Sequence, residues 1–277
     1  MNVLIIDEVK LNHLTLNEIL SDYYITDCYS ASKALEYISD KNYKFDCIII
    51  NMIMPEALDT ISKINNMNLD VYLPIIAILV EDTYHNKMEA FTYKIYDYFV
   101  KPFKASIINE RVLSAVTYHK RLEELVNGNI DLVKDLNPIT GTLNYNAAKW
   151  LIDEDIAKHK SNSLFVYCKI VGMEDIYKNY DLRTGNFTLY SIARFIMSQC
   201  QKKYIVGYLG NYDFCIYLMD LNKEEDTNIT VDKLIRMFVL QRGNSITDDV
   251  DIKMSYKYNN EFLDFEELLK ITKESAN

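Results

Sequence analysis

Polar residues follow three of the five short apolar runs in the first half of the sequence. Asp7 and Glu8 follow the first run, Asn51 follows the third and Lys101 follows the fifth. In open α/β sheets the carboxyl ends of parallel strands gather at one edge, where ligands bind. We therefore expect two acids, one amide and one lysine to form a cluster. Asn51 alone could equally serve as a cap or turn residue.

The five apolar runs alternate with segments whose apolar residues recur at helical spacing. This alternation predicts an α/β domain in which a parallel sheet carries helices on both faces. The predicted strands are residues 2–6, 24–30, 47–50, 75–80 and 96–100.

The composition is that of an ordinary soluble globular protein with room for two domains. The chain has 277 residues, of which 49% are hydrophobic and 25% are charged. The formal net charge of −10 opposes binding to a phosphate backbone, so we expect no nucleic-acid partner. No apolar run is long enough to cross a membrane, and Asp7 comes too early for a signal peptide.

Cysteine, histidine and glycine exclude several kinds of site. The five cysteines are scattered without a CxxC pair, which is typical of reduced, buried thiols in a cytoplasmic protein. The four histidines are isolated in sequence, so no zinc site is predicted. All seven glycines lie at or beyond position 128, which excludes a phosphate-binding glycine loop before that point. A nucleotide, if bound, would belong to the second half.

Three motifs give the first half a resemblance to a known family. "IIDE" (5–8), "DCIIINMIMPE" (46–56) and "DYFVKPF" (97–103) together resemble the receiver domain of bacterial two-component response regulators, over residues 1–121. The resemblance implies a flavodoxin-like, doubly wound fold with five parallel strands. In that family an acidic pair holds magnesium and an aspartate accepts a phosphoryl group from a histidine kinase. A Ser or Thr contacts that group, and a lysine balances its charge.

Carried across residue by residue, the resemblance places the acidic pair on Asp7 and Glu8 and the lysine on Lys101. It places the aromatic switch position of the family on Tyr98, three residues before that lysine.

The phosphoacceptor and hydroxyl positions fall on Asn51 and Leu79. A carboxamide is not an anionic nucleophile, and leucine offers no hydroxyl. We therefore expect a pseudo-receiver in which Lys101 pairs with Asp7 or Glu8 as a fixed electrostatic plug. Magnesium at these two acids would be weak at most, and no other cofactor is expected.

A helical pattern continues beyond the end of the receiver-like segment and predicts a helical linker over residues 122–136. Apolar residues recur at heptad spacing, which would let this helix pair with its copy in a homodimer. The pattern covers barely three heptads, and "NGN" (127–129) interrupts it. The heptad positions are Ile108, Ala115 and Leu122 in one series and Tyr118, Leu125 and Leu132 in the other.

The second half predicts an α/β domain of another kind, a mixed and mainly antiparallel sheet with helices on one face. The predicted elements are a helix over 147–160, a strand over 163–171, a helix over 182–203, two strands within 204–220 joined by a turn at 209–213, a helix near 230–242, a strand over 251–258 and a helix from Asp264.

This order of elements resembles the GGDEF domain of diguanylate cyclases over residues 137–277. "NPITGTLN" (137–144) is similar to the "DxLTGLxN" opening of that family. The resemblance implies a nucleotidyl-cyclase-like fold. The signature hairpin falls on Gly210, Asn211, Tyr212, Asp213 and Phe214, with Asp213 in place of a glutamate.

The residues that the cyclase reaction requires are missing. Family members align two GTP molecules with two metal ions, and the resemblance places the metal-binding acids on Lys169, Val171 and Tyr212. It places the guanine-reading positions on Tyr177 and Asn186. A lysine at a metal position adds positive charge where cations need anionic ligands. We therefore expect a degenerate diguanylate cyclase without activity.

Other family features are also absent from the second half. The RxxD product-binding pattern falls on residues 201–204 and is missing, and the sequence ends at Asn277 before the basic residues that contact phosphates in the family. We expect Asp213 to face water at the end of the hairpin. Lys169 could bind a phosphate or be a surface charge.

The leading hypothesis is a cytoplasmic, non-catalytic signalling protein with three segments, 1–121, 122–136 and 137–277. It would act through protein partners in a bacterial signalling pathway. The alternative is a sensor that binds GTP or cyclic di-GMP without turnover, which Lys169 favours and Tyr177 and Asn186 disfavour. An active, phosphorylation-controlled cyclase would require all these positions to be misaligned.

Overall fold

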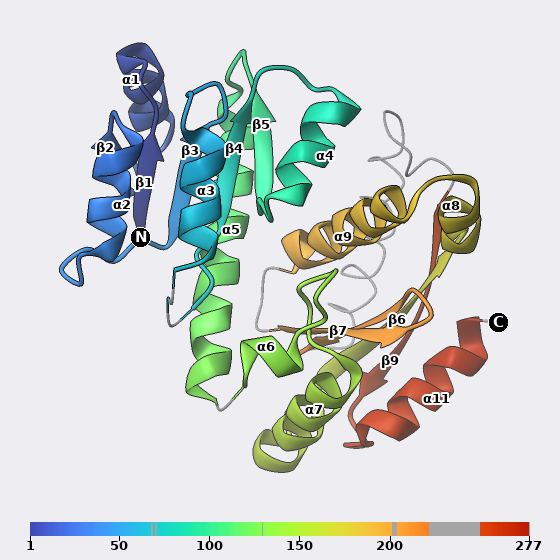
Figure 1. The fold of residues 1–277 in the computed structure, drawn as a ribbon. Coiled ribbons are helices and arrows are strands. Elements are labelled where there is room, and N and C mark those ends of the chain that lie inside the picture. Colours follow the sequence, from blue (N-terminus) through green and yellow to red (C-terminus); the bar gives the residue numbers. More distant parts are fainter. Residues whose placement is uncertain (68, 70, 129, 201–203, 222–249, 277) are drawn as a thin grey trace. The chain divides into compact units, whose positions relative to one another are not determined.

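The computed structural model describes residues 1–67, 69, 71–128, 130–200, 204–221 and 250–276. The chain divides into two compact units, Met1–Asn129 and Ile130–Asn277, and each unit contains its own sheet (Figure 1). The division falls inside the segment predicted as a linker. The three predicted domain boundaries stay a prediction.

The first unit is built on a parallel sheet of five strands in the order β2-β1-β3-β4-β5. This confirms the predicted sheet and its five strands. The strands are β1 (Asn2–Ile6), β2 (Tyr24–Cys28), β3 (Cys47–Asn51), β4 (Ile75–Leu79) and β5 (Asp97–Val100).

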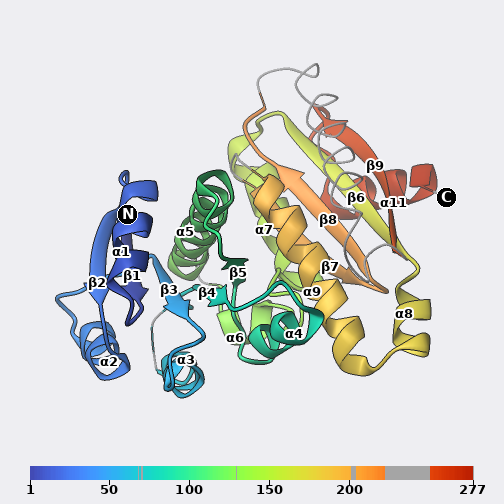
Figure 2. The ribbon, with the colours of Figure 1, turned by 90° about the horizontal axis from the view of Figure 1, so that it is seen from above.

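Five helices cover both faces of this sheet, as Figure 2 shows. α1 and α5 lie on one face, and α2, α3 and α4 lie on the other. Strands covered on both faces are continuous apolar runs, which explains why β3 and β4 are buried along their whole length. The helices are α1 (Lys10–Ile19), α2 (Ala31–Ser39), α3 (Ala57–Asn65), α4 (Tyr84–Thr92) and α5 (Ala105–Asn127).

The heptad positions of α5 are buried within the single chain. α5 ends at Asn127, where Gly128 is the C-cap, so the interruption predicted at "NGN" is present. Because the heptad side chains are buried, α5 offers no exposed apolar seam to a second copy, and the coiled-coil interpretation of the pattern is not supported. The buried positions are Ile108, Ala115, Tyr118, Leu122 and Leu125.

The second unit contains a sheet of four described strands in the order β7-β8-β6-β9. All strand pairs in it are antiparallel, and a single parallel bridge joins Leu143 to Gly207 beside β7. The strands are β6 (Ser163–Val171), β7 (Tyr204–Gly210), β8 (Asp213–Leu218) and β9 (Asp251–Asn259).

Helices lie on both faces of this second sheet, so the expectation of helices on one face was wrong. α7 and α11 lie on one face and α9 lies on the other (Figure 1). The cause is the central strand β8, which is buried at every position and therefore needs cover on both sides. The helices are α6 (Leu132–Asp135), α7 (Tyr145–His159), α8 (Met173–Asn179), α9 (Leu182–Gln199) and α11 (Phe265–Ala276). The helix predicted near 230–242 lies outside the described residues.

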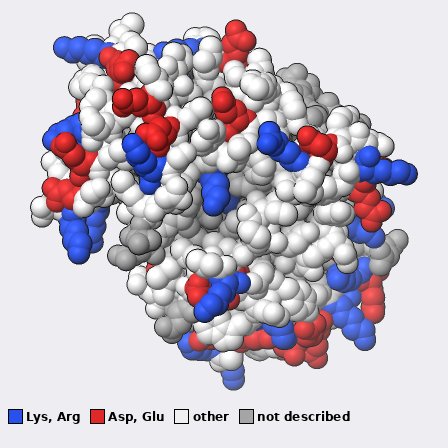
Figure 3. All heavy atoms as spheres, viewed as in Figure 1, with Lys and Arg blue, Asp and Glu red and all other residues white. Residues whose placement is uncertain are grey.

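All five cysteines are buried free thiols, as the sequence predicted. Burial raises the pKa of each thiol, to about 12 for Cys200 and Cys215. Across the ranges that the structure describes, no helix has the length and apolar character needed to cross a membrane. On the face of the molecule drawn in Figure 3, acidic and basic side chains are interspersed.

Candidate functional site

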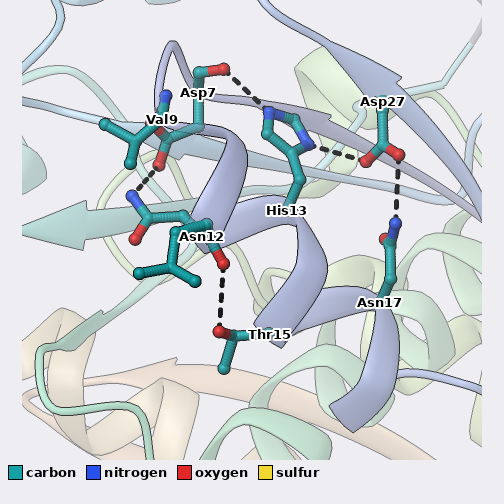
Figure 4. Close-up of polar contacts among 8 residues, drawn as sticks. Asp7, Val9, Asn12, His13, Thr15, Asn17 and Asp27 are labelled. Carbon is teal, nitrogen blue, oxygen red and sulfur yellow. Dashed lines mark hydrogen bonds and ion pairs between the residues drawn. The ribbon is translucent and has the colours of Figure 1, made fainter.

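Asp7, directly after β1, is the centre of the first candidate site. Its carboxylate is buried and accepts three hydrogen bonds from N–H groups. The backbone of Val9 donates to Oδ1 over 2.8 Å, and the amide of Asn12 donates to Oδ2 over 2.6 Å (Figure 4). The amide of Asn51 donates to the same Oδ2 over 3.1 Å. Neutral donors therefore satisfy the oxygens that a cation would otherwise contact.

Asn51, the last residue of β3, is 3% exposed and bonded at both ends of its amide. Its Oδ1 accepts the backbone N–H of Ile53 over 3.1 Å, which fixes the orientation of the amide and directs Nδ2 to Asp7. The side chain therefore both forms a turn and joins the predicted cluster.

Helix α1 supports the site through His13, which is buried. His13 Nε2 donates to the backbone carbonyl of Asp7 over 2.7 Å, and Nδ1 lies 2.6 Å from Oδ1 of Asp27 in β2. Asn17 donates to the other oxygen of Asp27 over 3.0 Å (Figure 4). These contacts tie one face of α1 to the ends of two strands.

The predicted pairing of Lys101 with the acids was wrong. Lys101 is exposed, and its ammonium lies 5.7 Å from the centre of the Phe103 ring. Within the described part of the chain it makes no ion pair with Asp7 or Glu8. The reason is that the Asp7 oxygens are already occupied, so the ammonium keeps its water instead of entering a buried site.

Tyr98, the predicted switch position in β5, lies near two cations. The Arg111 guanidinium is 4.8 Å from the ring centre and the Lys87 ammonium is 5.5 Å away. Each cation is held by an acid, Arg111 by Asp97 over 2.8 Å and Lys87 by Asp82 over 2.6 Å. Burial, the largest effect, raises the pKa of Tyr98, and the two cations oppose it. Two cations therefore contact this ring.

The residues of this site do not fit a magnesium ion. The Asp7 oxygens face N–H donors, Glu8 is exposed, and neither Asn51 nor the buried Leu79 brings an anionic oxygen. The described residues include no group of three or more His, Cys, Asp or Glu that could hold a metal.

The second candidate site surrounds the hairpin between β7 and β8. The predicted turn is present as a two-residue loop, Asn211–Tyr212, and both residues have positive φ angles, 51° and 66°. Gly210, before the loop, has φ 85°. The ring of Tyr212 stacks on that of Tyr177 in α8, with centroids 5.5 Å apart and planes 21° apart.

The two predicted base-reading positions contact each other. The Tyr177 hydroxyl donates to Oδ1 of Asn186 in α9 over 2.8 Å. Burial raises the pKa of Tyr177 to about 12. Its ring lies against Gly185, where a Cβ atom would be 2.4 Å from the nearest ring atom.

Asp213, at the start of β8, is 9% exposed, so the expectation that it faces water was wrong. The Tyr167 hydroxyl donates to its Oδ2 over 2.5 Å. Burial raises the pKa of Asp213, while the bond from Tyr167 and the charges of Lys273 and Lys169 oppose this shift. Asp213 is buried because β8 lies inside the sheet, between β7 and β6.

The predicted metal positions bring no acid to the end of β6. Lys169 is half-buried and pairs in register with Lys253 of β9, and Val171 is 38% exposed. Phe214 is buried and meets Tyr208 edge to face, with ring centroids 5.3 Å apart.

Residues 3–113 match the family model of the response regulator receiver domain. This segment is therefore similar to a receiver domain. Among curated proteins, the chain is 25% identical over 133 residues to two-component response regulator ORR26 of Oryza sativa subsp. japonica, covering 47% of this chain and 22% of that protein. It is 30% identical over 104 residues to two-component response regulator ARR18 of Arabidopsis thaliana, covering 37% and 16%. The chain thus spans about a fifth of the length of these relatives.

Solved structures similar to this chain include GGDEF proteins and receiver domains. The coiled coil and GGDEF domain of DgcB from Caulobacter crescentus, in complex with c-di-GMP, is 10% identical, with 61% of this chain and 92% of that chain covered and a TM-score of 0.48. Diguanylate cyclase SiaD from Pseudomonas aeruginosa, in complex with its activator SiaC, is 16% identical, with 62% and 74% covered and a TM-score of 0.47. A receiver domain protein from Clostridium thermocellum is 18% identical, with 44% and 98% covered and a TM-score of 0.40. Similarities at this level carry no conclusion about what this chain binds or catalyses.

Sequence reasoning missed Asn12, His13 and Asp27 near the receiver site. Asn12 and His13 precede Leu16 at the spacing of the buried face of α1, which was the available signal. Asp27 gave no signal, because an acid in a short strand is usually exposed.

Proposed function

We propose that this chain is a non-catalytic signalling protein. Its receiver domain is not phosphorylated, its second unit is a degenerate GGDEF-like domain, and it acts in the cytoplasm through protein partners of a bacterial signalling pathway. The observation that carries the proposal is that Asn51 donates a hydrogen bond to Asp7 at the position where a receiver needs a nucleophile.

The chemistry of the receiver site supports this proposal. Phosphorylation of a receiver requires a carboxylate oxygen to attack phosphorus, with a cation to balance the charge. Asn51 provides a neutral amide with both ends engaged, and the Asp7 oxygens are occupied by N–H donors. This arrangement supports the absence of both a nucleophile and a cation site.

The second unit supports the proposal independently. Lys169, Val171 and Tyr212 bring no carboxylate to the predicted metal positions. The remaining acid of the hairpin, Asp213, is buried and bonded to Tyr167. Among the described residues, these positions supply no carboxylate for two-metal catalysis, which supports the proposal.

Action through protein contacts is consistent with the state of Tyr98. A protein that cannot be phosphorylated can still present one fixed surface, or can be shifted by a partner that binds one conformation more tightly. The contacts of Arg111 and Lys87 with the Tyr98 ring favour a fixed conformation.

Two assays on the full chain test the proposal. After incubation with acetyl phosphate and Mg²⁺, intact mass spectrometry should show no addition of a phosphoryl group. After incubation with GTP and Mg²⁺ or Mn²⁺, chromatography should show no cyclic di-GMP. An active receiver and an active cyclase serve as positive controls. A phosphoryl adduct in the first assay or cyclic di-GMP in the second would contradict the proposal.

Binding of a nucleotide without turnover is the second candidate function. It is favoured by Lys169 and Lys253, which place two positive charges opposite each other on β6 and β9. A thermal-shift screen with GTP, GDP and cyclic di-GMP separates the two candidates. A ligand at 100 times its dissociation constant adds about 2.7 kcal/mol of stability, whereas the first candidate predicts no shift.

A further inference from the structure

Strand β9 lies at one margin of the second sheet, and none of the described strands pairs with its outer edge. It pairs with β6 along all nine of its residues, without a bulge, and it contains no proline. Natural edge strands are usually short, bulged or interrupted by proline, because the N–H and C=O groups of a regular edge invite another strand. β9 is a long, regular edge strand without these features.

The opposite margin of the sheet, at β7, is covered by the chain itself. The N–H of Leu143 donates to the carbonyl of Val206 over 3.2 Å, and the N–H of Tyr208 donates to the carbonyl of Leu143 over 2.7 Å. The described residues place no such segment beside β9. The two margins therefore differ, and β9 is the one that can accept a further strand.

The side chains of β9 alternate between the two faces of the sheet. Ser255 is buried and its hydroxyl donates to the carbonyl of Thr272 in α11 over 2.6 Å, so the odd-numbered residues lie on the face that α11 covers. The charged residues of the strand share this face: Asp251, Lys253 and Lys257. The opposite face carries apolar and aromatic residues: Ile252, Met254, Tyr256 and Tyr258.

We infer that β9 pairs with the β9 strand of a second copy of this chain, in the antiparallel direction and about a two-fold axis that passes through Met254. The second sheets of the two copies then form one continuous sheet. Such an axis is perpendicular to the sheet, so equal faces of the two copies lie on the same side and every contact occurs twice. This inference goes beyond the proposed function, which specifies no oligomeric state.

The side chains of β9 complement their own copies in this register. With the axis at Met254, Asp251 lies opposite Lys257 of the second copy. In the same register, Ile252 lies opposite Tyr256 of the second copy. Opposite charges and pairs of an aromatic with a β-branched residue both stabilise neighbouring strands.

The two nearest alternative registers bring like charges together. An axis at Ser255 would place Lys253 opposite Lys257 of the second copy. An axis at Lys253 would place this lysine opposite its own copy. Like charges that lie directly opposite each other destabilise a strand pair, so the register about Met254 is preferred.

Lys257 has to exchange one weak contact to form this pair. Its ammonium lies 3.5 Å from Glu261 of its own chain, in an exposed contact that contributes little to stability. The surface buried by edge pairing is small, so we expect a dimer that depends on protein concentration.

The first test is the oligomeric state of the full chain. Light scattering after size-exclusion chromatography, at loading concentrations of about 1 to 500 µM, should show a mass that rises from that of the monomer towards that of the dimer. A monomer at every concentration would overturn the inference.

Charge variants test the contact between Asp251 and Lys257. Lys257→Asp places two acids opposite each other twice in the dimer, so it should raise the dissociation constant of the dimer about tenfold or more. Combining Lys257→Asp with Asp251→Lys restores opposite charges and should restore the dimer. Lys41→Asp makes the same change of charge at an exposed position of the first unit and should match the wild type.

Circular dichroism confirms that each charge variant is folded. A dimer that folded Lys257→Asp does not weaken would use another surface, and this result would overturn the inference. A folded double variant that remains as weak as Lys257→Asp would overturn it as well.

A disulfide cross-link tests the register. The Cα atoms of directly opposed residues in an antiparallel pair lie about 4.5–5.5 Å apart, within the range of a disulfide. Met254→Cys should therefore form a covalent dimer on oxidation with copper phenanthroline, whereas Tyr256→Cys, which lies opposite Ile252, should not. The native cysteines are buried, so the wild type serves as the control without a cross-link. Equal cross-linking of the two variants, or none in Met254→Cys, would contradict the inference.

Discussion

A carboxamide and a carboxylate have nearly the same shape, but one end of the amide donates a hydrogen bond. At position 51 this difference changes the receiver site from two carboxylates that need a cation to one carboxylate surrounded by N–H groups. The site is stable without an ion because Asp7 is already satisfied.

Asn51→Asp should reverse this arrangement. The new carboxylate would lie close to Asp7 Oδ2, which Asn51 contacts at 3.1 Å, and would remove a donor. We expect the free energy of unfolding to fall by about 1–3 kcal/mol without divalent ions, and Mg²⁺ to restore part of this loss. Urea unfolding with and without Mg²⁺ measures both effects.

The control for this experiment is Asn260→Asp at an exposed position, which makes the same change of charge. Wild type and control should show no response to Mg²⁺. An Asn51→Asp variant whose stability is also independent of Mg²⁺ would show that the two side chains do not share a cation site.

Asp213 should make stability depend on pH in a direction unusual for an acid. Burial raises the pKa of Asp213 in the folded chain above its ordinary value, so the folded state retains the proton to higher pH than the unfolded state. The contribution of Asp213 to stability is therefore fully present at low pH and is lost as pH rises through the folded pKa. Asp213→Asn removes this loss.

We expect the stability of Asp213→Asn relative to wild type to increase as pH is raised over this window. Urea unfolding at a series of pH values measures it. Glu274→Gln changes an exposed position in α11. Its free energy of unfolding should vary with pH in the same way as that of the wild type. A constant difference between Asp213→Asn and wild type at all pH values would contradict the raised pKa.

The sequence predicted which residues lie at the two sites, but it predicted their contacts less well. It placed Asp7 and Asn51 in one cluster because strand ends converge, and the two side chains are hydrogen bonded. It did not foresee that Lys101 stays outside, since that depends on whether the Asp7 oxygens are free. It also placed Asp213 in water, because a hairpin pattern does not show which strands will flank it.

At the scale of elements, α7 and α11 are joined by a side-chain cap. Asp153 of α7 accepts the backbone N–H of Phe265, the first residue of α11, over 2.8 Å. Asp153 also pairs with Lys149, which lies 3.5 Å from Glu266 of α11. One carboxylate thus satisfies a helix end and links two helices that cover the same face of the sheet.

Asp153→Ala should lower the free energy of unfolding by about 1 kcal/mol, the usual loss when a cap is removed. Glu154→Ala is the matched control on the same helix. Glu154 pairs with Lys158 at the surface, and its loss should change stability by less than about 0.5 kcal/mol. Urea unfolding of both variants measures the difference. Equal effects would mean that the cap contributes nothing.

Elements were predictable where a pattern was long enough to show its period. The five strands of the first unit and the helices α7, α9 and α11 were predicted from apolar spacing. α8 was missed because seven residues make only two turns, whereas α6 lies inside the segment 122–136 that was predicted as helical. The presence of helices on both faces of the second sheet depends on which strand lies in the centre. Local sequence patterns do not predict the order of the strands.

At the scale of the whole molecule, the chain is two compact units that each have a core. The first unit includes α5, whose residues Ile108, Val112 and Ala115 are buried. Helix α5 is therefore part of the first core and not only a connection.

A fragment of residues 1–129 should fold alone, whereas a fragment of residues 1–104 should not, because it lacks the buried face of α5. Circular dichroism on heating measures the thermal unfolding of both fragments. We expect a cooperative transition for the longer fragment and none for the shorter one. A longer fragment without a transition would show that the first unit requires the second.

The reactivity of the buried cysteines can report the unfolding of each unit. Cys28 and Cys47 belong to the first unit, and Cys168, Cys200 and Cys215 belong to the second. Alkylating reagents attack only an accessible thiolate, and in the folded chain every thiol is hidden and has a raised pKa. Labelling should therefore occur only when a unit opens. The chain can be treated briefly with iodoacetamide at increasing urea concentrations, and the labelled peptides can be identified by mass spectrometry. The fraction of each cysteine labelled should give a separate unfolding curve for each unit, without any engineered cysteine.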